Sequence, residues 1–193
     1  MSNWRGSVWV VSWVLSAALS GCVGAERVGE PALTRRYQEL QLRSARLQQL
    51  AIQLAIVAYR IDASRVRDGV NYSPHGDMQG REGVTVRDAD GRIRVTLGDD
   101  AFSSAGILGS TIGHEIEVHV NRQVAKGIDY AEGDSQGTSM QEVEAYDYEL
   151  QNKDRFGLSE EDIRLLQQRR RTHYQRLQLE NRRRVDEGVY RKW

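Results

Sequence analysis

The residues of this chain that could do chemistry are concentrated in one apolar stretch, IGHEIEVH at positions 112–119. Imidazole nitrogens bind Zn²⁺ well, and a carboxylate beside them can take a proton from water at the metal. His114 and His119 are therefore candidate metal ligands, and Glu115 is a candidate general base. The competing interpretation is one packed and one exposed histidine, with Glu115 and Glu117 as ordinary helix charges.

The spacing of the two histidines constrains the helix that carries them. They lie five positions apart, and at about 3.6 residues per turn a step of five rotates the second side chain by roughly 140°. One extra residue in the helix, a π-bulge, would return both rings to one side, and such bulges are frequent at functional sites. If both rings bind one ion, the helix between Thr111 and Asn121 must lose its i→i−4 pattern near Ile116 to Val118.

A second group of carboxylates follows in the stretch QEVEAYD at positions 141–147. The two stretches together resemble the gluzincin metallopeptidases, and the histidine spacing resembles the HExxxH motif of the dipeptidyl peptidase III family. The resemblance implies that His114, His119 and Glu142 hold one Zn²⁺ per chain, with Glu115 as the general base. It covers these motifs and does not extend to the large two-lobed fold of that family.

The second stretch departs from the gluzincin pattern at one position. The family places an acid that hydrogen-bonds a ligand histidine four residues after the ligand glutamate, where this chain has Tyr146. The orienting role then passes to Asp147, with Tyr146 as a further residue expected near the ligands. Glu144 remains a rival of Glu142 as the third ligand.

The N-terminus has the features of a bacterial lipoprotein precursor. Arg5 precedes the apolar run Val8–Leu19, which is too short to cross about 30 Å of hydrocarbon as a helix. The run ends in LSGC at positions 19–22, which resembles the lipobox of bacterial lipoproteins. The resemblance implies a signal peptide over residues 1–21 and lipidation, with acyl chains such as palmitate, at Cys22.

The lipobox also predicts the organisation and the location of the mature chain. Residues 22–31, with two glycines and Pro31, form a lipidated tether, and residues 32–193 form a single zincin-like catalytic domain. Val23 stands where enterobacterial lipoproteins that stay in the inner membrane carry aspartate. In a Gram-negative organism we therefore expect a lipid anchor in the outer membrane, with the domain on its periplasmic face.

These features predict a zinc-dependent metallopeptidase, a hydrolase of peptides or proteins in the cell envelope. Two alternatives remain open. One is a non-catalytic envelope lipoprotein that uses a degenerate peptidase domain as a binding or scaffold module. The other is a metallohydrolase that acts on a non-peptide bond of the envelope. Nucleic acid is not an expected partner, because the formal net charge is zero and creates no bulk field toward it.

The pattern of apolar residues predicts an α+β fold in which helices dominate. A short antiparallel hairpin, with strands at Val84–Val86 and Ile93–Leu97, precedes the motif helix. The gluzincin resemblance implies that its second strand pairs with the extended substrate. We expect His75 in a loop and His173 in solvent. Helices are expected over Ala32–Tyr59, from Ser103 or Ser104 to Lys126, over Thr138–Arg155 and from Ser159 onward, with a loop over Asp62–Glu82.

Overall fold

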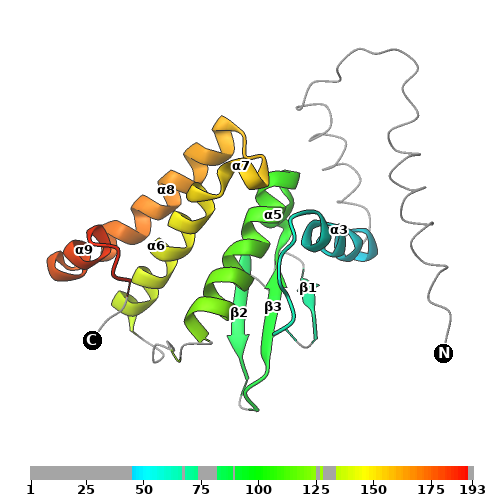
Figure 1. Cartoon of the computed structure of the whole chain (residues 1–193), viewed down its shortest axis with the longest axis horizontal. Helices are drawn as coiled ribbons and strands as arrows, with labels where there is room; N and C mark the ends of the chain where they lie inside the picture. The colour runs from blue at the N-terminus through cyan, green and yellow to red at the C-terminus, as the bar shows by residue number, and fades with distance from the viewer. Residues whose placement is uncertain are drawn as a thin grey trace. The chain divides into compact units, whose positions relative to one another are not determined.

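The computed structural model is an α+β fold in which helices dominate and a small sheet lies beside the motif helix (Figure 1). It describes residues 45–66, 68–73, 82–88, 90–124, 127 and 134–190. These residues belong to one compact unit, Thr34–Trp193. The predicted fold class is confirmed. The expected signal peptide, tether, lipidated Cys22 and loop residue His75 lie outside the described residues.

The sheet has three strands in the order β1-β3-β2. They are β1 (Val70–Tyr72), β2 (Gly83–Arg87) and β3 (Ile93–Leu97). β2 and β3 form the expected antiparallel hairpin, with Val84 opposite Thr96. The hairpin is confirmed, but β3 is the central strand and β2 the outer one. The strand that could receive an extended substrate is therefore β2, and the expectation that named β3 was wrong.

β1 lies in a segment that was expected to be a loop, and that prediction was also wrong. It pairs parallel with β3, and the fully buried Val70 lies opposite Val95. Gln49 of α3 (Ala45–Ala58) donates to the Val70 carbonyl at 2.6 Å and accepts from the Tyr72 N–H at 3.2 Å. Three residues are too few to show strand alternation, so tertiary contacts position this segment.

The helices begin where polar side chains can satisfy their free N–H groups. Ser104 caps the motif helix, because its Oγ accepts from the Ile107 N–H at 2.9 Å. Ser159 and Asp162 form a capping box at the start of the penultimate helix. In chain order the further helical elements are η1 (Asp99–Phe102), α5 (Ala105–Gly113), η2 (His114–Gln123), α6 (Ser135–Gln151), α7 (Lys153–Phe156), α8 (Glu160–Arg176) and α9 (Leu179–Asp186).

The last predicted helix is interrupted, because the chain turns to bury an apolar residue. Leu177 has extended backbone angles and is 3% exposed. It packs with Met140 and Val143 of α6 and with Val185 of α9 in a second, smaller core. One helix from Ser159 toward the C-terminus was therefore the wrong expectation, since a straight continuation would not bring α9 back against α6.

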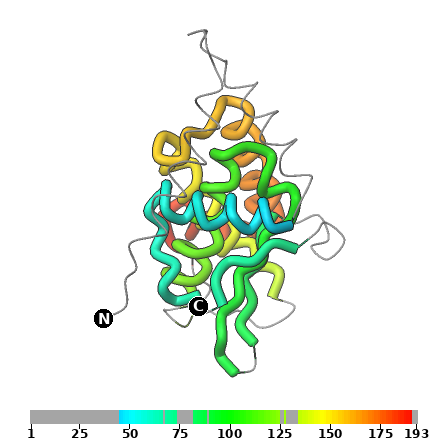
Figure 2. Tube along the Cα trace, turned by 90° about the vertical axis from the view of Figure 1, so that its right-hand side faces the viewer, coloured from blue at the N-terminus to red at the C-terminus, as the bar shows by residue number. Residues whose placement is uncertain are grey.

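The layers run from the sheet through the motif helix to the pair α6 and α8 (Figures 1 and 2). η2 contacts β2 and β3 on one side and α6 on the other, and α6 packs along α8. The main core lies where α3, the sheet and α5–η2 meet, and includes Ile52, Val70, Val95, Leu97, Leu108, Ile112 and Ile116.

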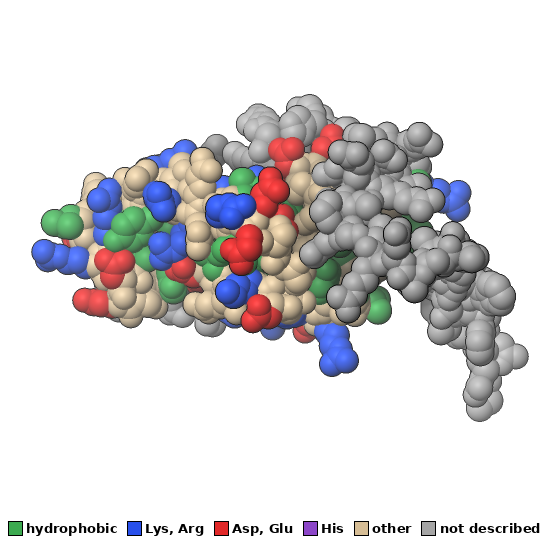
Figure 3. All heavy atoms as spheres, turned by 90° about the horizontal axis from the view of Figure 1, so that it is seen from above, with side chains coloured by type: hydrophobic (Ala, Val, Ile, Leu, Met, Phe, Trp, Pro, Cys, Tyr) green, Lys and Arg blue, Asp and Glu red, His purple; other side chains and the backbone are tan. Residues whose placement is uncertain are grey.

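The charged side chains on one face of the described domain are dispersed (Figure 3). On the face drawn in Figure 3, basic and acidic side chains alternate, in keeping with a formal net charge of zero. Within the described ranges, none of the helices combines the length and the apolarity needed to span a membrane.

Phe156 is the aromatic residue that joins α7 to the main core. It is 1% exposed and packs edge-on against Tyr59, with ring centroids 5.4 Å apart. We expect Phe156→Ala to lower the free energy of unfolding by about 3–5 kcal/mol, through lost burial and the cavity left behind. Val57→Ala is the control: its side chain is 75% exposed, so a change within about 0.5 kcal/mol is expected. Urea unfolding followed by circular dichroism measures both, and equal effects would contradict this view of the core.

Candidate metal centre

The helix that carries the two histidines is a π-helix where their spacing demands one. The chain is α-helical up to Gly113, and η2 then runs as a π-helix over the ten residues His114–Gln123. At its end the N–H of Val124 donates to the carbonyl of His119, five residues back. The same N–H also contacts the carbonyl of Val120, four residues back. The expected departure from a regular α-helix is confirmed, and the π-helix extends over the whole of η2 rather than over a single bulge.

The π-helix brings His114 and His119 to the same side. Their ring centroids are 4.8 Å apart. One ring nitrogen of each and one carboxylate oxygen of Glu115 all lie within 4.8 Å of one another. This group of three side chains could hold a metal ion.

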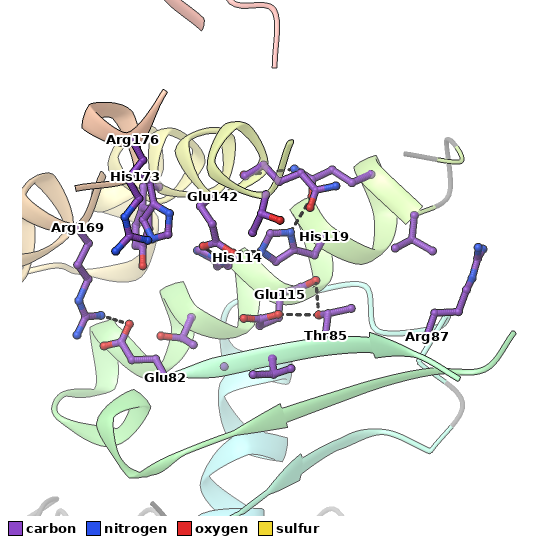
Figure 4. A pocket seen from close by; sticks show the side chains of 18 residues that line it. Glu82, Thr85, Arg87, His114, Glu115, His119, Glu142, Arg169, His173 and Arg176 are labelled. Carbon is purple, nitrogen blue, oxygen red and sulfur yellow. Dashed lines mark hydrogen bonds and ion pairs between the residues drawn. The ribbon is translucent and has the colours of Figure 1, made fainter. Parts of the chain in front are cut away.

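Glu142 reaches the same point from α6. Its Oε2 lies 3.5 Å from Nε2 of His114, and its Oε1 lies 3.6 Å from Nε2 of His119. In a tetrahedral zinc site with bonds of about 2.0–2.1 Å, neighbouring donor atoms are about 3.3–3.4 Å apart. The Glu142 carboxylate thus lies at nearly the ligand-to-ligand distance from each of the two nitrogens (Figure 4).

A buried glutamate that sequence reasoning missed holds His114. Oε1 of Glu149 pairs with Nδ1 of His114 at 2.8 Å, and Ser110 donates to the other oxygen. Glu149 is 2% exposed. A carboxylate on the second ring nitrogen is the usual support of a ligand histidine. The spacing offered a signal: Glu149 follows Glu142 by seven residues, about two turns, and so lies on the same face of α6.

Asp147 was expected to take this orienting role, and that expectation was wrong. It follows Glu142 by five residues, which turns its side chain away by roughly 140° in a regular α-helix. Its carboxylate accepts from Nη2 of Arg170 and from the Tyr190 hydroxyl, both at 3.0 Å. Asp147 therefore ties α6 to α8 and to the C-terminal segment.

His119 is held by a chain of two hydrogen bonds. Nε2 of Gln123 donates to Oε2 of Glu144 at 2.8 Å, so its Oε1 is the acceptor that pairs with Nδ1 of His119 at 2.7 Å. This assignment places the His119 proton on Nδ1 and leaves Nε2 toward Glu142. Glu144, considered above as a rival ligand, thus lies one residue further from the metal position.

Glu115 lies beside the two histidines, between η2 and β2. The Thr85 hydroxyl donates to its Oε2 at 2.6 Å. On its other side the backbone of Gly83 comes so close that a Cβ there would lie 2.6 Å from Oε1 of Glu115. Glycine at position 83 therefore leaves room for the carboxylate. Glu115 is only 4% exposed, and its carboxylate is held between Thr85 and Gly83.

The surroundings of the site favour positive charge. Burial lowers the pKa of His114, but Glu142 and Glu149 outweigh it and raise the pKa well above its ordinary value. Burial raises the pKa of Glu142, but hydrogen bonding with His114 and the nearby charge of His119 lower it to about 2. A cation placed among these groups would meet the same two carboxylates.

Glu117, between the two histidines in sequence, holds the opposite side of η2. Its carboxylate forms two hydrogen bonds of 2.9 Å with the guanidinium of Arg155, and the Tyr148 hydroxyl donates to it as well. A Cβ on Gly113 would lie 2.8 Å from the Phe156 ring. The start of η2 is thus pressed closely against α6 and α7.

The site opens into a cleft of about 610 Å³ between β2, η2, α6 and α8. Figure 4 shows Arg169 of α8 reaching Glu82, just before β2, with which it forms an ion pair. Burial raises the pKa of Glu82, and Arg169 offsets part of that effect.

The centroid of the Tyr146 ring lies 5.1 Å from that of the His114 ring and 5.8 Å from that of the His173 ring. His173 therefore lines the cleft, and its expected place in solvent was wrong.

Comparison of the chain with protein-family models, with curated proteins and with solved structures finds no match.

The support of His114 can be tested by separating Glu149 from Asp147. We expect Glu149→Gln to weaken metal binding by about ten- to a hundredfold, because the ring loses the carboxylate that orients it. Asp147→Asn should leave metal affinity unchanged, since Asp147 contacts Arg170 and Tyr190 instead. Competition with a chromogenic chelator measures both. A larger loss for Asp147→Asn than for Glu149→Gln would show that the support is misassigned.

Proposed function

We propose that this protein is a lipid-anchored, zinc-dependent metallopeptidase that hydrolyses peptides or proteins of the cell envelope. One observation carries the proposal: the two oxygens of the Glu142 carboxylate lie 3.5 Å from Nε2 of His114 and 3.6 Å from Nε2 of His119. Glu115 lies beside them within the cleft. Two helices and an edge strand thus supply three ligands, a carboxylate base and a place for an extended substrate.

The choice of zinc rests on the donor set. Two imidazole nitrogens and one carboxylate are the ligands of catalytic zinc sites that keep a fourth position open. The hydrogen bonds that Nδ1 of each histidine donates to Glu149 or Gln123 leave Nε2 of each histidine as the ligand atom. His114 and Glu142 are largely shielded from solvent, which favours binding over exchange with water.

Glu115 is the residue that moves protons in the proposed reaction. Zinc bound at this site supplies Lewis acidity toward water and toward the substrate carbonyl. Oε2 of Glu115 is occupied by the Thr85 hydroxyl, so Oε1 is the atom free to take the proton from water. The same oxygen then returns the proton to the departing amine, as a general base that becomes a general acid.

β2 supplies the wall along which a peptide can lie. It is one of the two outer strands of the sheet, and Gly83, Val84 and Thr85 line the cleft beside Glu115. An extended peptide can add to such an edge through main-chain hydrogen bonds, with little demand on its side chains. This arrangement supports a peptide rather than a small metabolite as substrate.

The proposed metal site predicts about one zinc per chain. We expect His114→Ala, His119→Ala and Glu142→Ala each to lose most bound zinc, because a three-ligand site depends on every ligand. Glu115→Gln should retain zinc and lose about 10²–10⁴-fold in peptide hydrolysis. Metal analysis and assays with a mixed peptide library measure both. Zinc retained by His119→Ala would refute the two-histidine site. Zinc binding without any peptide hydrolysis would favour a binding module or another hydrolase.

The proposed anchor has its own test in a bacterium that processes lipoproteins. We expect wild-type chain, but not Cys22→Ser, to incorporate a fatty-acid analogue and to fractionate with membranes, because the thiol carries the lipid. Gel fluorescence after labelling in culture measures this. Label on the serine variant, or none on the wild type, would contradict the lipoprotein assignment.

A further inference from the structure

The cleft has a distinct basic end. Figure 4 shows Arg169, His173 and Arg176 gathered on one side of His114 and Glu142, with Arg87 on the opposite side. At the basic end, Arg169 of α8 pairs with Glu82, just before β2. This ion pair connects the two walls, so a peptide that lies along β2 meets it after passing the metal position.

Arg176 is the basic residue at this end that lacks a partner. Arg169 pairs with Glu82 and Arg170 with Asp147. Within the described residues, the Arg176 side chain forms neither an ion pair nor a hydrogen bond, although it lines the cleft. Two solvent-shielded atoms nearby, Nδ1 of His173 and Oε1 of Glu82, also lack hydrogen-bond partners among those residues. Those two atoms are shielded from a ligand as well as from water, so in the described part of the chain the exposed Arg176 guanidinium is the unpaired group that a ligand in the cleft can reach.

The direction of a bound peptide follows from the sheet. β2 is antiparallel to β3, and antiparallel pairing is slightly more stable per residue than parallel pairing. A peptide added antiparallel to the free edge of β2 runs from Arg87 toward Gly83. Its carboxyl end then points to Glu82, Arg169 and Arg176.

We propose that the basic end of the cleft binds the C-terminal carboxylate of the substrate, with Arg176 as its main ligand, so that the protein trims peptides from their carboxyl ends. This inference rests on the proposed peptidase function. Water adds across the scissile C–N bond, giving a new carboxylate on the shortened peptide and a free amine on the released fragment. A guanidinium matches a carboxylate in shape and can bind it with two parallel hydrogen bonds.

Binding tests the proposal without catalysis. The probe is dansyl-tetra-alanine, either with a free C-terminal carboxylate or as its amide, added to full-length Glu115→Gln protein freed of metal by chelation. We expect the free acid to bind about tenfold more tightly than the amide. The double variant Glu115→Gln/Arg176→Gln should lose this preference. Arg171→Gln is the matched control, an exposed arginine of the same helix outside the cleft lining, and should keep it.

Kinetics of the zinc-loaded protein separate this proposal from the proposed function. We expect kcat/KM to be about tenfold higher for the free acid than for the amide, and Arg176→Gln to lower only the value for the acid. Arg176→Lys should restore part of the difference. Equal hydrolysis of acid and amide would overturn the carboxylate site and leave the peptidase in place. Equal binding of both probes would overturn it as well, whether or not any peptide is hydrolysed.

Discussion

The candidate site depends on hydrogen bonds that reach five residues back along one helix. In an α-helix His114 and His119 would face directions roughly 140° apart, and no choice of side-chain rotamers would easily bring both rings to one ion. The π-helix over His114–Gln123 removes that offset. Every other feature of the site, from the position of Glu142 to the strand beside Glu115, has a use only when the two rings meet.

The hydrogen bonds around the histidines divide the support between two helices. His114 is fixed from α6 by a hydrogen bond to Glu149. His119 is fixed within η2 by Gln123, which donates a hydrogen bond to Glu144 of α6. α6 therefore contributes one carboxylate near the metal position and two behind the rings. Its docking on α8, through pairs such as Asp147 with Arg170, sets the distance between all of these groups and the motif helix.

The motif helix and the hairpin were predictable because local patterns encode them. Each pattern spans only a few residues: Ser104 caps the motif helix, the five-residue spacing of the histidines predicts the π-helix, and apolar Val95 and Leu97 alternate with polar residues in the strand. β1 was not predictable, since three residues carry no period and Gln49 positions them from a distant helix. Glu149 does not follow from the family pattern, because that pattern places the acid one turn after Glu142, whereas in this chain it lies two turns after it. The bend at Leu177 depends on the core it joins, which sequence alone does not display.

The ten-residue π-helix can also be described as an α-helix that takes up surplus residues in wider turns. The helix up to Gly113 packs against Tyr59 and Phe156, while the part after Gly113 contacts the sheet and α6. Deleting one residue between the histidines would produce the commoner HExxH spacing. In a regular α-helix a step of four residues turns the side chain by about 400°, so the two rings would still face one side, and the buried Val120 and Gln123 beyond them would keep nearly their present directions. The long spacing and the shorter motif are therefore one inserted residue apart, and the π-helix takes up that residue without turning the buried side chains that follow it.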